Sequence, residues 1–438
     1  MSKKTFTLII VIVLAGIAGV YYWFFIRSTS PTIDTTTGTS ENAGGSPIFG
    51  FGTKTGGTGA GGATSGKNQG TTNTGNTTNT PAVPVLRQLS TTPVGGMIAS
   101  TTASTTIVRW VDRGVGRVYQ AYSDSIAVEE LSNTTIPRIY NTFWNKNGTS
   151  FILQSLAEDS DAVTTFYTTL YPVSTSTSAT STPDSTTPYA LRGSALPSDT
   201  VAVAVSPKGD RVFTLENKAE GSVNGANFVD NNTIGSISQF NGSKKTQIFS
   251  TPLSALNIEW PEENTIALTT KGSSVAAGYL YFVDQKTGIF NKVIGNISGL
   301  TTLTSKDATK VMYSTTVGNS IKSFLYNIKT GANTNMLFNT MPEKCVWSTL
   351  QKNILYCAVP SQIPSGNYPE DWYQGNISFS DSIWEVDTST GDAHLVADLL
   401  KTANTVIDAT TLVLDPKENF LYFVNKKNLT LWSLELNG

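Results

Sequence analysis

The stretch "AVAVSPKGDRVFTL" (residues 202–215) contains an apolar run, a tight turn and a second run in which apolar and polar residues alternate. Looser copies recur as "NIEWPEENTIALTT" (257–270) and "LVLDPKENFLYFVN" (412–425). Alternation is typical of a strand with one buried face, and a short apolar run is typical of a strand buried on both faces. The stretch therefore predicts two neighbouring antiparallel strands, and its recurrence predicts a repeat protein.

The turn of this motif recurs along the chain at intervals of 43–67 residues. Most copies are followed by a second hairpin with a glycine-containing turn, as in "LYFVDQKTGIFNKV" (280–293). Each unit therefore amounts to four short strands, and no unit of this size can bury its faces alone. The pattern predicts an all-β propeller of four-stranded blades. The seven turns are centred near Ser100, Asn145, Ser206, Trp260, Ser305, Ser348 and Asp415.

The strand count also predicts how the ring closes. Six complete blades follow one another from "VGGMIAS" (94–100), but the seventh has only three strands, the last of which is "LTLWSLEL" (429–436). A further strand, "PVLRQLS" (84–90), precedes blade one and has no blade of its own. Unpaired strand edges favour aggregation. We therefore predict a seven-bladed β-propeller over residues 84–438 that is closed by this N-terminal strand. Six and eight blades are the alternatives, because the fourth strand of blade two is weakly patterned.

Several turns resemble those of a known class of repeats. "SPKGDRVF" (206–213) and "DPKENFLYF" (415–423), with "VDQKTG" (283–288) and "VDTSTG" (386–391) in later hairpins, resemble TolB-type and dipeptidyl-peptidase-type, WD-like β-propeller repeats. The resemblance covers about residues 85–438 and implies a fold far more than an activity. The sequence has no G-x-S-x-G nucleophile motif, so peptidase activity is not implied.

The N-terminal region predicts a membrane anchor. Residues 5–26 carry no charge and, as a helix, span roughly 33 Å at about 1.5 Å per residue, enough to cross a bilayer. Lys3 and Lys4 precede the segment, so the positive-inside rule places the N-terminus in the cytoplasm and the propeller outside the cell membrane. A cleaved signal peptide is the alternative. We divide the chain into an anchor (1–27), a disordered Thr/Ser/Gly linker (28–83) and the propeller (84–438).

Two cysteines, Cys345 and Cys357, flank the hairpin "CVWSTLQKNILYC" (345–357) of blade six. The spacing places them opposite each other or one position out of register, and opposed residues in antiparallel strands have Cα atoms about 4.5–5.5 Å apart. An extracytoplasmic location permits oxidation. We therefore predict a disulfide, with two buried thiols as the alternative.

The sequence offers few residues for catalysis or metal binding. Its single histidine, His394, lies in an alternating strand, whereas metal sites and nucleophilic triads need histidines with placed partners. The acidic run 158–161 lacks the spaced ligands of a calcium loop. We therefore expect no catalytic residue, no metal, no cofactor and no enzyme. A propeller hydrolase or lyase is the alternative, and channel carboxylates with raised pKa values would favour it.

Charge excludes one class of partner. Charged residues make up 14% of the chain, its net charge is −2 and it has no basic run. Nucleic-acid binding requires a positive surface, so no nucleic-acid partner is expected.

Two long connections, 217–232 in blade three and 360–380 in blade six, lie between second and third strands and so emerge on the face that carries the links between blades. We predict that the blade-six connection binds a protein or glycan partner at the cell envelope, because exposed aromatics give large contact areas. The alternative is that Trp372 and Tyr373 fold back over the channel. The predicted function is therefore a membrane-anchored extracytoplasmic binding or scaffold module. The predicted contact residues are Tyr368, Glu370, Asp371, Trp372 and Tyr373.

Overall fold

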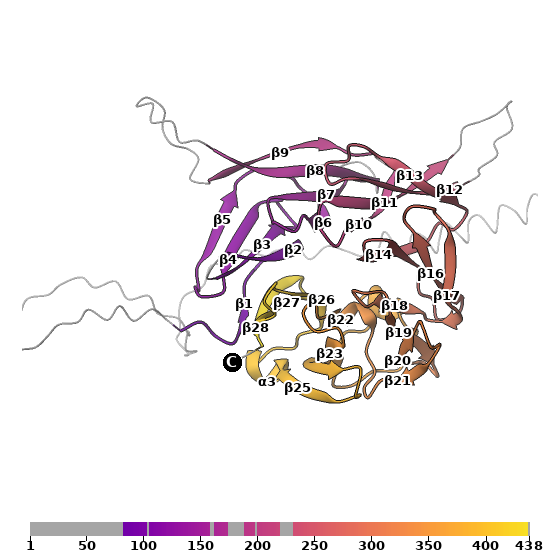
Figure 1. Cartoon of the computed structure of the whole chain (residues 1–438). Helices are drawn as coiled ribbons and strands as arrows, with labels where there is room; N and C mark the ends of the chain where they lie inside the picture. Colours follow the sequence, from indigo (N-terminus) through magenta and orange to yellow (C-terminus); the bar gives the residue numbers. More distant parts are fainter. Residues whose placement is uncertain are drawn as a thin grey trace, which may run out of the picture. The chain divides into compact units, whose positions relative to one another are not determined.

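The computed structural model describes residues 82–436 except 103–104, 158–161, 174–187, 198 and 220–230. These residues form seven antiparallel sheets of four strands each, which follow one another around a ring (Figure 1). The prediction of an all-β, seven-bladed propeller is confirmed.

In each of the first six blades, the chain runs from the innermost strand outward. Blades one to three comprise β2 (Val94–Thr101), β3 (Thr106–Asp112), β4 (Val118–Tyr122) and β5 (Val128–Ser132); β6 (Ile139–Trp144), β7 (Ser150–Leu156), β8 (Val163–Pro172) and β9 (Tyr189–Ala195); and β10 (Thr200–Val205), β11 (Arg211–Ala219), β12 (Asn231–Gln239) and β13 (Thr246–Thr251). Blades four to six comprise β14 (Leu256–Glu262), β15 (Thr265–Thr270), β16 (Ala277–Asp284) and β17 (Phe290–Ser298); β18 (Thr301–Thr304), β19 (Lys310–Val317), β20 (Ser320–Asn327) and β21 (Asn333–Asn335); and β22 (Cys345–Trp347), β23 (Ile354–Pro360), β24 (Asp381–Asp387) and β25 (Ala393–Asp398).

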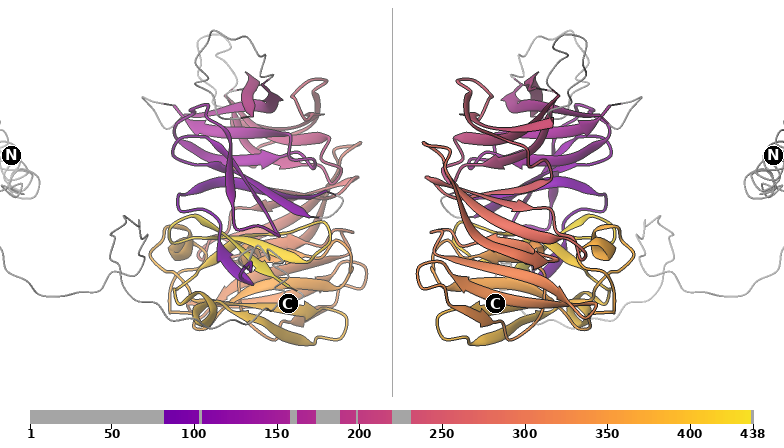
Figure 2. Two further views of the ribbon diagram at one scale, coloured as in Figure 1. Left: turned by 90° about the vertical axis from the view of Figure 1, so that its left-hand side faces the viewer. Right: turned by 90° about the vertical axis from the view of Figure 1, so that its right-hand side faces the viewer.

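Blade seven contains strands from both ends of the propeller. Its sheet runs from β26 (Ala409–Leu414) through β27 (Phe420–Asn425) and β28 (Thr430–Glu435) to β1 (Leu86–Gln88), which Figure 2 shows in indigo beside the yellow strands. Leu86 lies opposite Leu434, and both are buried in one apolar cluster. The Arg87 side chain donates hydrogen bonds to the carbonyls of Tyr122 and Ser125 in blade one. The predicted closure is confirmed, and Arg87 links the closing strand to the first blade.

Apolar side chains from adjacent blades form the core between them. Phe213 and Phe249 of blade three pack in one buried cluster with Trp260 and Ile266 of blade four. Fully burying one such side chain stabilises the fold by about 1.5–3 kcal/mol. The turn "SPKGD" (206–210) depends on glycine, because Gly209 has φ 74° and a Cβ atom there would lie 2.6 Å from the backbone nitrogen of Lys146. The packing explains why each blade needs its neighbours.

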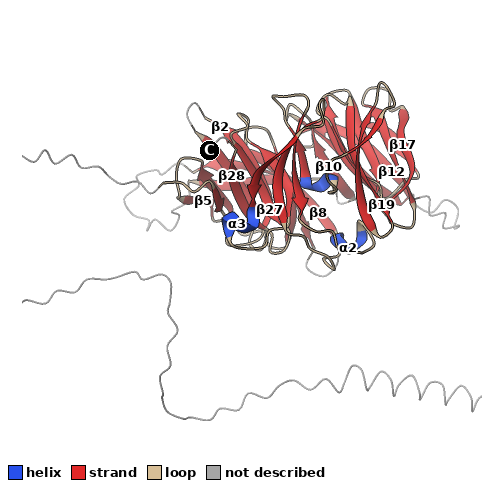
Figure 3. Ribbon diagram, turned by 90° about the horizontal axis from the view of Figure 1, so that it is seen from below, coloured by secondary structure: helices blue, strands red, loops and turns tan. Residues whose placement is uncertain are grey.

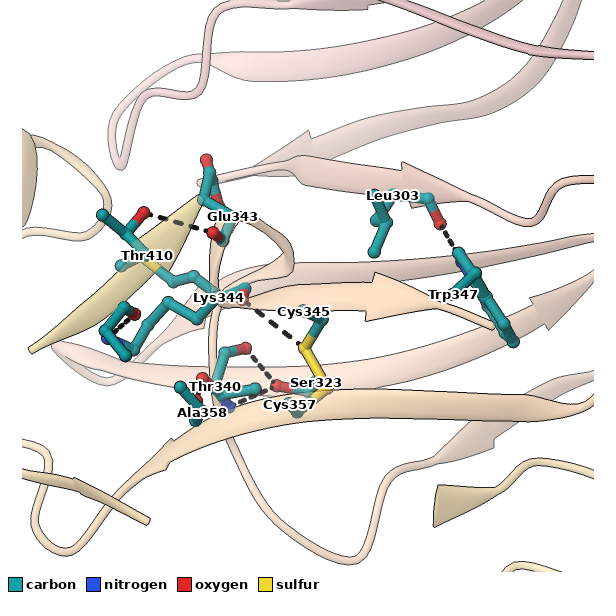
Figure 4. Close-up of a disulfide and its surroundings, with 12 residues drawn as sticks. Leu303, Ser323, Thr340, Glu343, Lys344, Cys345, Trp347, Cys357, Ala358 and Thr410 are labelled. Carbon is teal, nitrogen blue, oxygen red and sulfur yellow. Dashed lines mark hydrogen bonds between the residues drawn. A yellow bond between two sulfur atoms is a disulfide. The ribbon is translucent and has the colours of Figure 1, made fainter. Parts of the chain in front are cut away.

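The cysteines form the predicted disulfide. Cys345 lies directly opposite Cys357 in the pairing of β22 with β23, with a Cα–Cα distance of 4.1 Å. Figure 4 shows this bond and its surroundings.

Among the described residues, three short helices lie in connections of the last three blades: η2 (Pro342–Lys344) before β22, α2 (Glu370–Tyr373) between β23 and β24, and α3 (Leu399–Ala403) after β25. Figure 3 shows α2 and α3 on the same side of the propeller, as expected for connections that emerge on the face of the inter-blade links.

The predicted anchor and nearly all of the predicted linker, residues 1–81, lie outside the described residues. Within the described ranges, no helix is both long and apolar enough to cross a membrane. The anchor and the domain boundaries stay predictions from the sequence.

Candidate functional site

The blade-six loop (residues 360–380) has a small apolar core of its own. Tyr368 and Trp372 are 2% and 3% exposed and pack with Phe379 of the same loop. Ile321 of β20 and Met341, which follows β21 in the chain, complete this core. Tyr368 and Trp372 therefore do not present an open aromatic surface, and a partner contact through this loop stays a prediction.

Trp372 is fixed by a buried ion cluster, which we define as Lys344, Asp381 and Asp408. The indole Nε1 of Trp372 donates to Asp408 Oδ2 at 3.0 Å. The Lys344 Nζ lies 2.5 Å from Asp408 Oδ1 and 2.7 Å from Asp381 Oδ2, and all three side chains of the cluster are 0% exposed. Burial raises the pKa of Asp381 to about 6, although the Lys344 ammonium opposes this shift. The cluster ties the blade-six loop to the start of blade seven.

The other three predicted contact residues also make contacts within the propeller. Glu370 Oε1 accepts hydrogen bonds from the backbone N–H of Ser274 at 2.7 Å and from its hydroxyl at 3.2 Å. Asp371 accepts one from the backbone N–H of Asn367 at 2.7 Å. The Tyr373 hydroxyl donates to Glu343 Oε1. The loop therefore reaches blade four through Glu370 and the entry to blade six through Tyr373.

Tyr373 borders a cavity of about 530 Å³, which we call the channel cavity. Innermost strands of blades four to seven contribute to its wall, together with η2 and α2, so it lies in the propeller's central channel. Leu303, Pro342, Cys345 and Leu412 are its apolar or sulfur-bearing residues. Its polar lining residues are Asn257, Glu259, Thr269, Lys271, Thr301, Thr302, Glu343, Tyr373 and Thr411.

Two carboxyl groups that line the channel cavity have raised pKa values. Burial raises the pKa of Glu259 to about 7, against the lowering effects of the Thr304 backbone N–H, 2.8 Å from Oε2, and of Lys306. Burial also raises the pKa of Glu343, although the hydrogen bond from Tyr373 opposes this. Near neutral pH Glu259 is therefore present in both protonation states, as a general acid or base requires.

The sequence interpretation missed Glu259 and Glu343. Glu259 occupies the position of "NIEWPEENTIALTT" (257–270) that Ala204 occupies in "AVAVSPKGDRVFTL" (202–215), so a charge at an apolar position of an innermost strand was the available signal. Glu343 precedes its innermost strand, beside Lys344 in Figure 4, and no repeat pattern marks it.

The remaining sequence candidates lie elsewhere. His394 is exposed on β25, with Nε2 3.7 Å from Glu385 Oε2. The acidic run 158–161 and most of the blade-three connection fall outside the described residues. In the part of the chain that the structure describes, no three His, Cys, Asp or Glu side chains are grouped as metal ligands.

Comparison with known proteins shows similarity of fold. No family model matches the chain, and no curated protein matches it significantly in sequence. Similar solved structures include an oligogalacturonate lyase from Vibrio parahaemolyticus, with 10% identity, coverage of 80% of this chain and 93% of that one, and a TM-score of 0.49. The β-propeller domain of the Trilobed protease from Pyrococcus furiosus has 9% identity, coverage of 79% and 98%, and a TM-score of 0.46. TolB from Acinetobacter baumannii has 13% identity, coverage of 63% and 58%, and a TM-score of 0.38.

These comparisons confirm the predicted resemblance to TolB-type and peptidase-type propellers. They also overturn the expectation that the chain is not an enzyme, because similar structures include lyases, an acylaminoacyl peptidase and a puromycin hydrolase. A propeller of this kind gives no ground for excluding catalysis. At about 10% identity to these enzymes the likeness concerns the fold alone and assigns no activity.

Proposed function

We propose that this chain is a membrane-anchored extracytoplasmic β-propeller that binds the polar end of a protein or glycan partner at the cell envelope in its channel cavity. The observation that carries the proposal is the cavity itself, whose polar lining comes from several rigid blades and from Tyr373 of the blade-six loop. Its volume of about 530 Å³ lies within the range of small-ligand sites. It has room for a sugar ring or the end of a peptide.

The disulfide supports the proposed location. Cys345 and Cys357 are bonded, and structural disulfides are characteristic of oxidising compartments outside the cytoplasm. The uncharged segment 5–26 supports the anchor. After alkaline extraction of membranes, we expect the full chain in the membrane pellet and a variant without residues 2–27 in the supernatant. Recovery of the full chain in the supernatant would contradict anchoring.

A cavity-filling substitution tests the proposed ligand site. Asn257 is exposed in the channel cavity, so Asn257→Trp should fill part of it without removing a core contact. Asn335→Trp is the matched control, because Asn335 is an exposed residue of the short edge strand β21. Saturation-transfer NMR against a panel of monosaccharides, disaccharides and short peptides should detect binding to the wild type and the control but not to Asn257→Trp. Equal binding to all three proteins would place the ligand outside the channel.

A second candidate function is acid–base chemistry on the bound ligand, as in a hydrolase or lyase. The pKa of about 7 for Glu259, in a cavity that it shares with Glu343, favours this function. For a ligand that is turned over, Glu259→Gln should abolish turnover and retain binding. Unchanged turnover would exclude Glu259 as the acid or base.

A further inference from the structure

The strand directions order the polar groups of the channel cavity along the channel axis. β14 starts at Leu256 on the face of the inter-blade links, so Asn257 lies nearer to that face than Glu259 does. β15 runs antiparallel to β14 and pairs Thr269 with Asn257, so Lys271, just beyond its end, lies on the same face. The Lys271 backbone N–H donates to the carbonyl of Ala255 at 2.9 Å, which fixes its position. Lys271 and Asn257 therefore flank one mouth of the cavity.

The charged side chains of the cavity differ in whether they have hydrogen-bond partners within the protein. Glu259 accepts a hydrogen bond from the Thr304 backbone at 2.8 Å, and Glu343 accepts one from the Tyr373 hydroxyl. Lys271 is exposed and lines the cavity, and among the described residues its Nζ has no ion-pair or hydrogen-bond partner. The exposed charge that has no partner at this mouth is therefore a cation, although the buried Oε2 of Glu343 also lacks a hydrogen-bond partner among the described residues.

We propose that the ligand of the channel cavity carries a carboxylate, which Lys271 pairs with and the Asn257 side-chain amide hydrogen-bonds. This inference rests on the proposed function, because it names the chemical class of ligand for the same cavity. A lysine ammonium is a strong donor to a carboxylate, and an amide N–H adds a second, directional bond. Two sources supply such a group: an acidic sugar and the C-terminus of a peptide.

The carboxyl groups of the cavity are compatible with an acidic ligand. The raised pKa values of Glu259 and Glu343 mean that both carry less negative charge near neutral pH than ordinary glutamates do, so they repel an anion less. Lys271 lines the cavity and Lys306 acts electrostatically on Glu259, while Tyr373 is neutral because burial raises its pKa. Binding of a carboxylate should therefore weaken as the pH rises through about 7 and Glu259 ionises.

Matched pairs of probes test the inference on the full chain in detergent. D-glucuronate is compared with D-glucose, and N-acetylalanine with N-acetylalaninamide, by titration calorimetry at low salt. We expect at least one acid to bind about tenfold more tightly than its neutral partner, and Lys271→Gln to remove that preference. Lys329→Gln, at an exposed turn lysine between β20 and β21, is the control and should leave the preference unchanged.

The outcomes separate this inference from the proposed function. If the neutral probes bind as well as the acids, and Asn257→Trp abolishes both, the cavity is a ligand site but its ligand is not chosen by charge, and the inference fails alone. The inference also fails alone if Lys271→Gln keeps the preference for the acid. If no probe binds to the wild type, the inference and the proposed ligand site are both overturned. Which acid binds identifies the source of the carboxylate.

Discussion

Replacing Lys344 by methionine should destabilise the propeller in a strongly pH-dependent way. The substitution removes the ammonium from Asp381, Asp408 and the Ala409 carbonyl, which lie 2.7, 2.5 and 2.9 Å from Nζ. Methionine fills a similar volume, so the main loss is the uncompensated charge of two fully buried carboxylates. Breaking a buried ion pair by removing one partner costs about 3–5 kcal/mol.

The pH dependence follows from the proton that one carboxyl must then take up. The pKa of Asp381 is already raised from 3.8 to about 6 with Lys344 present, and loss of the ammonium raises it further. When the pKa of a carboxyl is higher in the folded than in the unfolded protein, the free energy of unfolding falls as the pH rises from the unfolded pKa to the folded pKa. Keeping this carboxyl protonated in the folded protein becomes more costly as the pH rises above the unfolded value of 3.8, up to a pH of about 6 in the wild type and to a higher pH in the variant. We therefore expect a loss of about 3–5 kcal/mol at pH 7.5 and a clearly smaller loss at pH 5.0, where Asp381 is mostly protonated in both proteins.

Urea unfolding followed by tryptophan fluorescence at the two pH values measures both losses. Lys401→Met is the matched control, because Lys401 is 85% exposed and its ion pair with Asp398 lies at the surface. Such a pair contributes about 0–1 kcal/mol, so the control should change little at either pH. Two results would refute the claim that the ion cluster is charged, fully buried and stabilising. One is a loss for Lys344→Met no larger than that of the control, and the other is an equal loss at both pH values.

Three further variants test other parts of the structure. Leu86→Ala should lower the free energy of unfolding by about 2–3 kcal/mol and speed amide hydrogen exchange in β28; unchanged exchange there would contradict closure by β1. Cys345→Ser with Cys357→Ser should cost about 3 kcal/mol in calorimetric unfolding, and an unchanged value would mean that the bond does not form in solution. Because Glu259 has a pKa of about 7 rather than 4.5, its contribution to stability should fall as the pH rises from 4.5 to 7. Glu259→Gln should flatten this part of a melting-temperature profile, and an identical slope would show that the carboxyl titrates normally.

The strands were predictable because their pattern is local. "SFILQSL" (150–156) contains the apolar run "FIL", lies between turn sequences and coincides with β7, which is buried along nearly its whole length. The closing strand was also predictable, since a strand without a blade and a blade without a fourth strand require each other. For the cysteines the short hairpin left two registers, directly opposed or one position apart, and in the structure Cys345 faces Cys357 directly.

The site was less predictable because it depends on residues that are distant in sequence. The blade-six loop contains the polar and aromatic residues of an exposed contact surface, but Ile321 and Met341 of neighbouring segments provide the apolar surface that buries Tyr368 and Trp372. The titration of Glu259 likewise depends on its enclosure by the folded channel and on Glu343, 84 positions later in the numbering. Repeat patterns report strands and turns, and they carry no information about which side chains meet in the channel.

A crystal structure of the protein with D-glucuronate, or with whichever acidic probe binds most tightly, tests the central claim most directly. We predict ligand density in the channel cavity, with the carboxylate of the ligand within hydrogen-bond distance of Lys271 and Asn257. An empty channel with the ligand bound on an outer blade surface would contradict it.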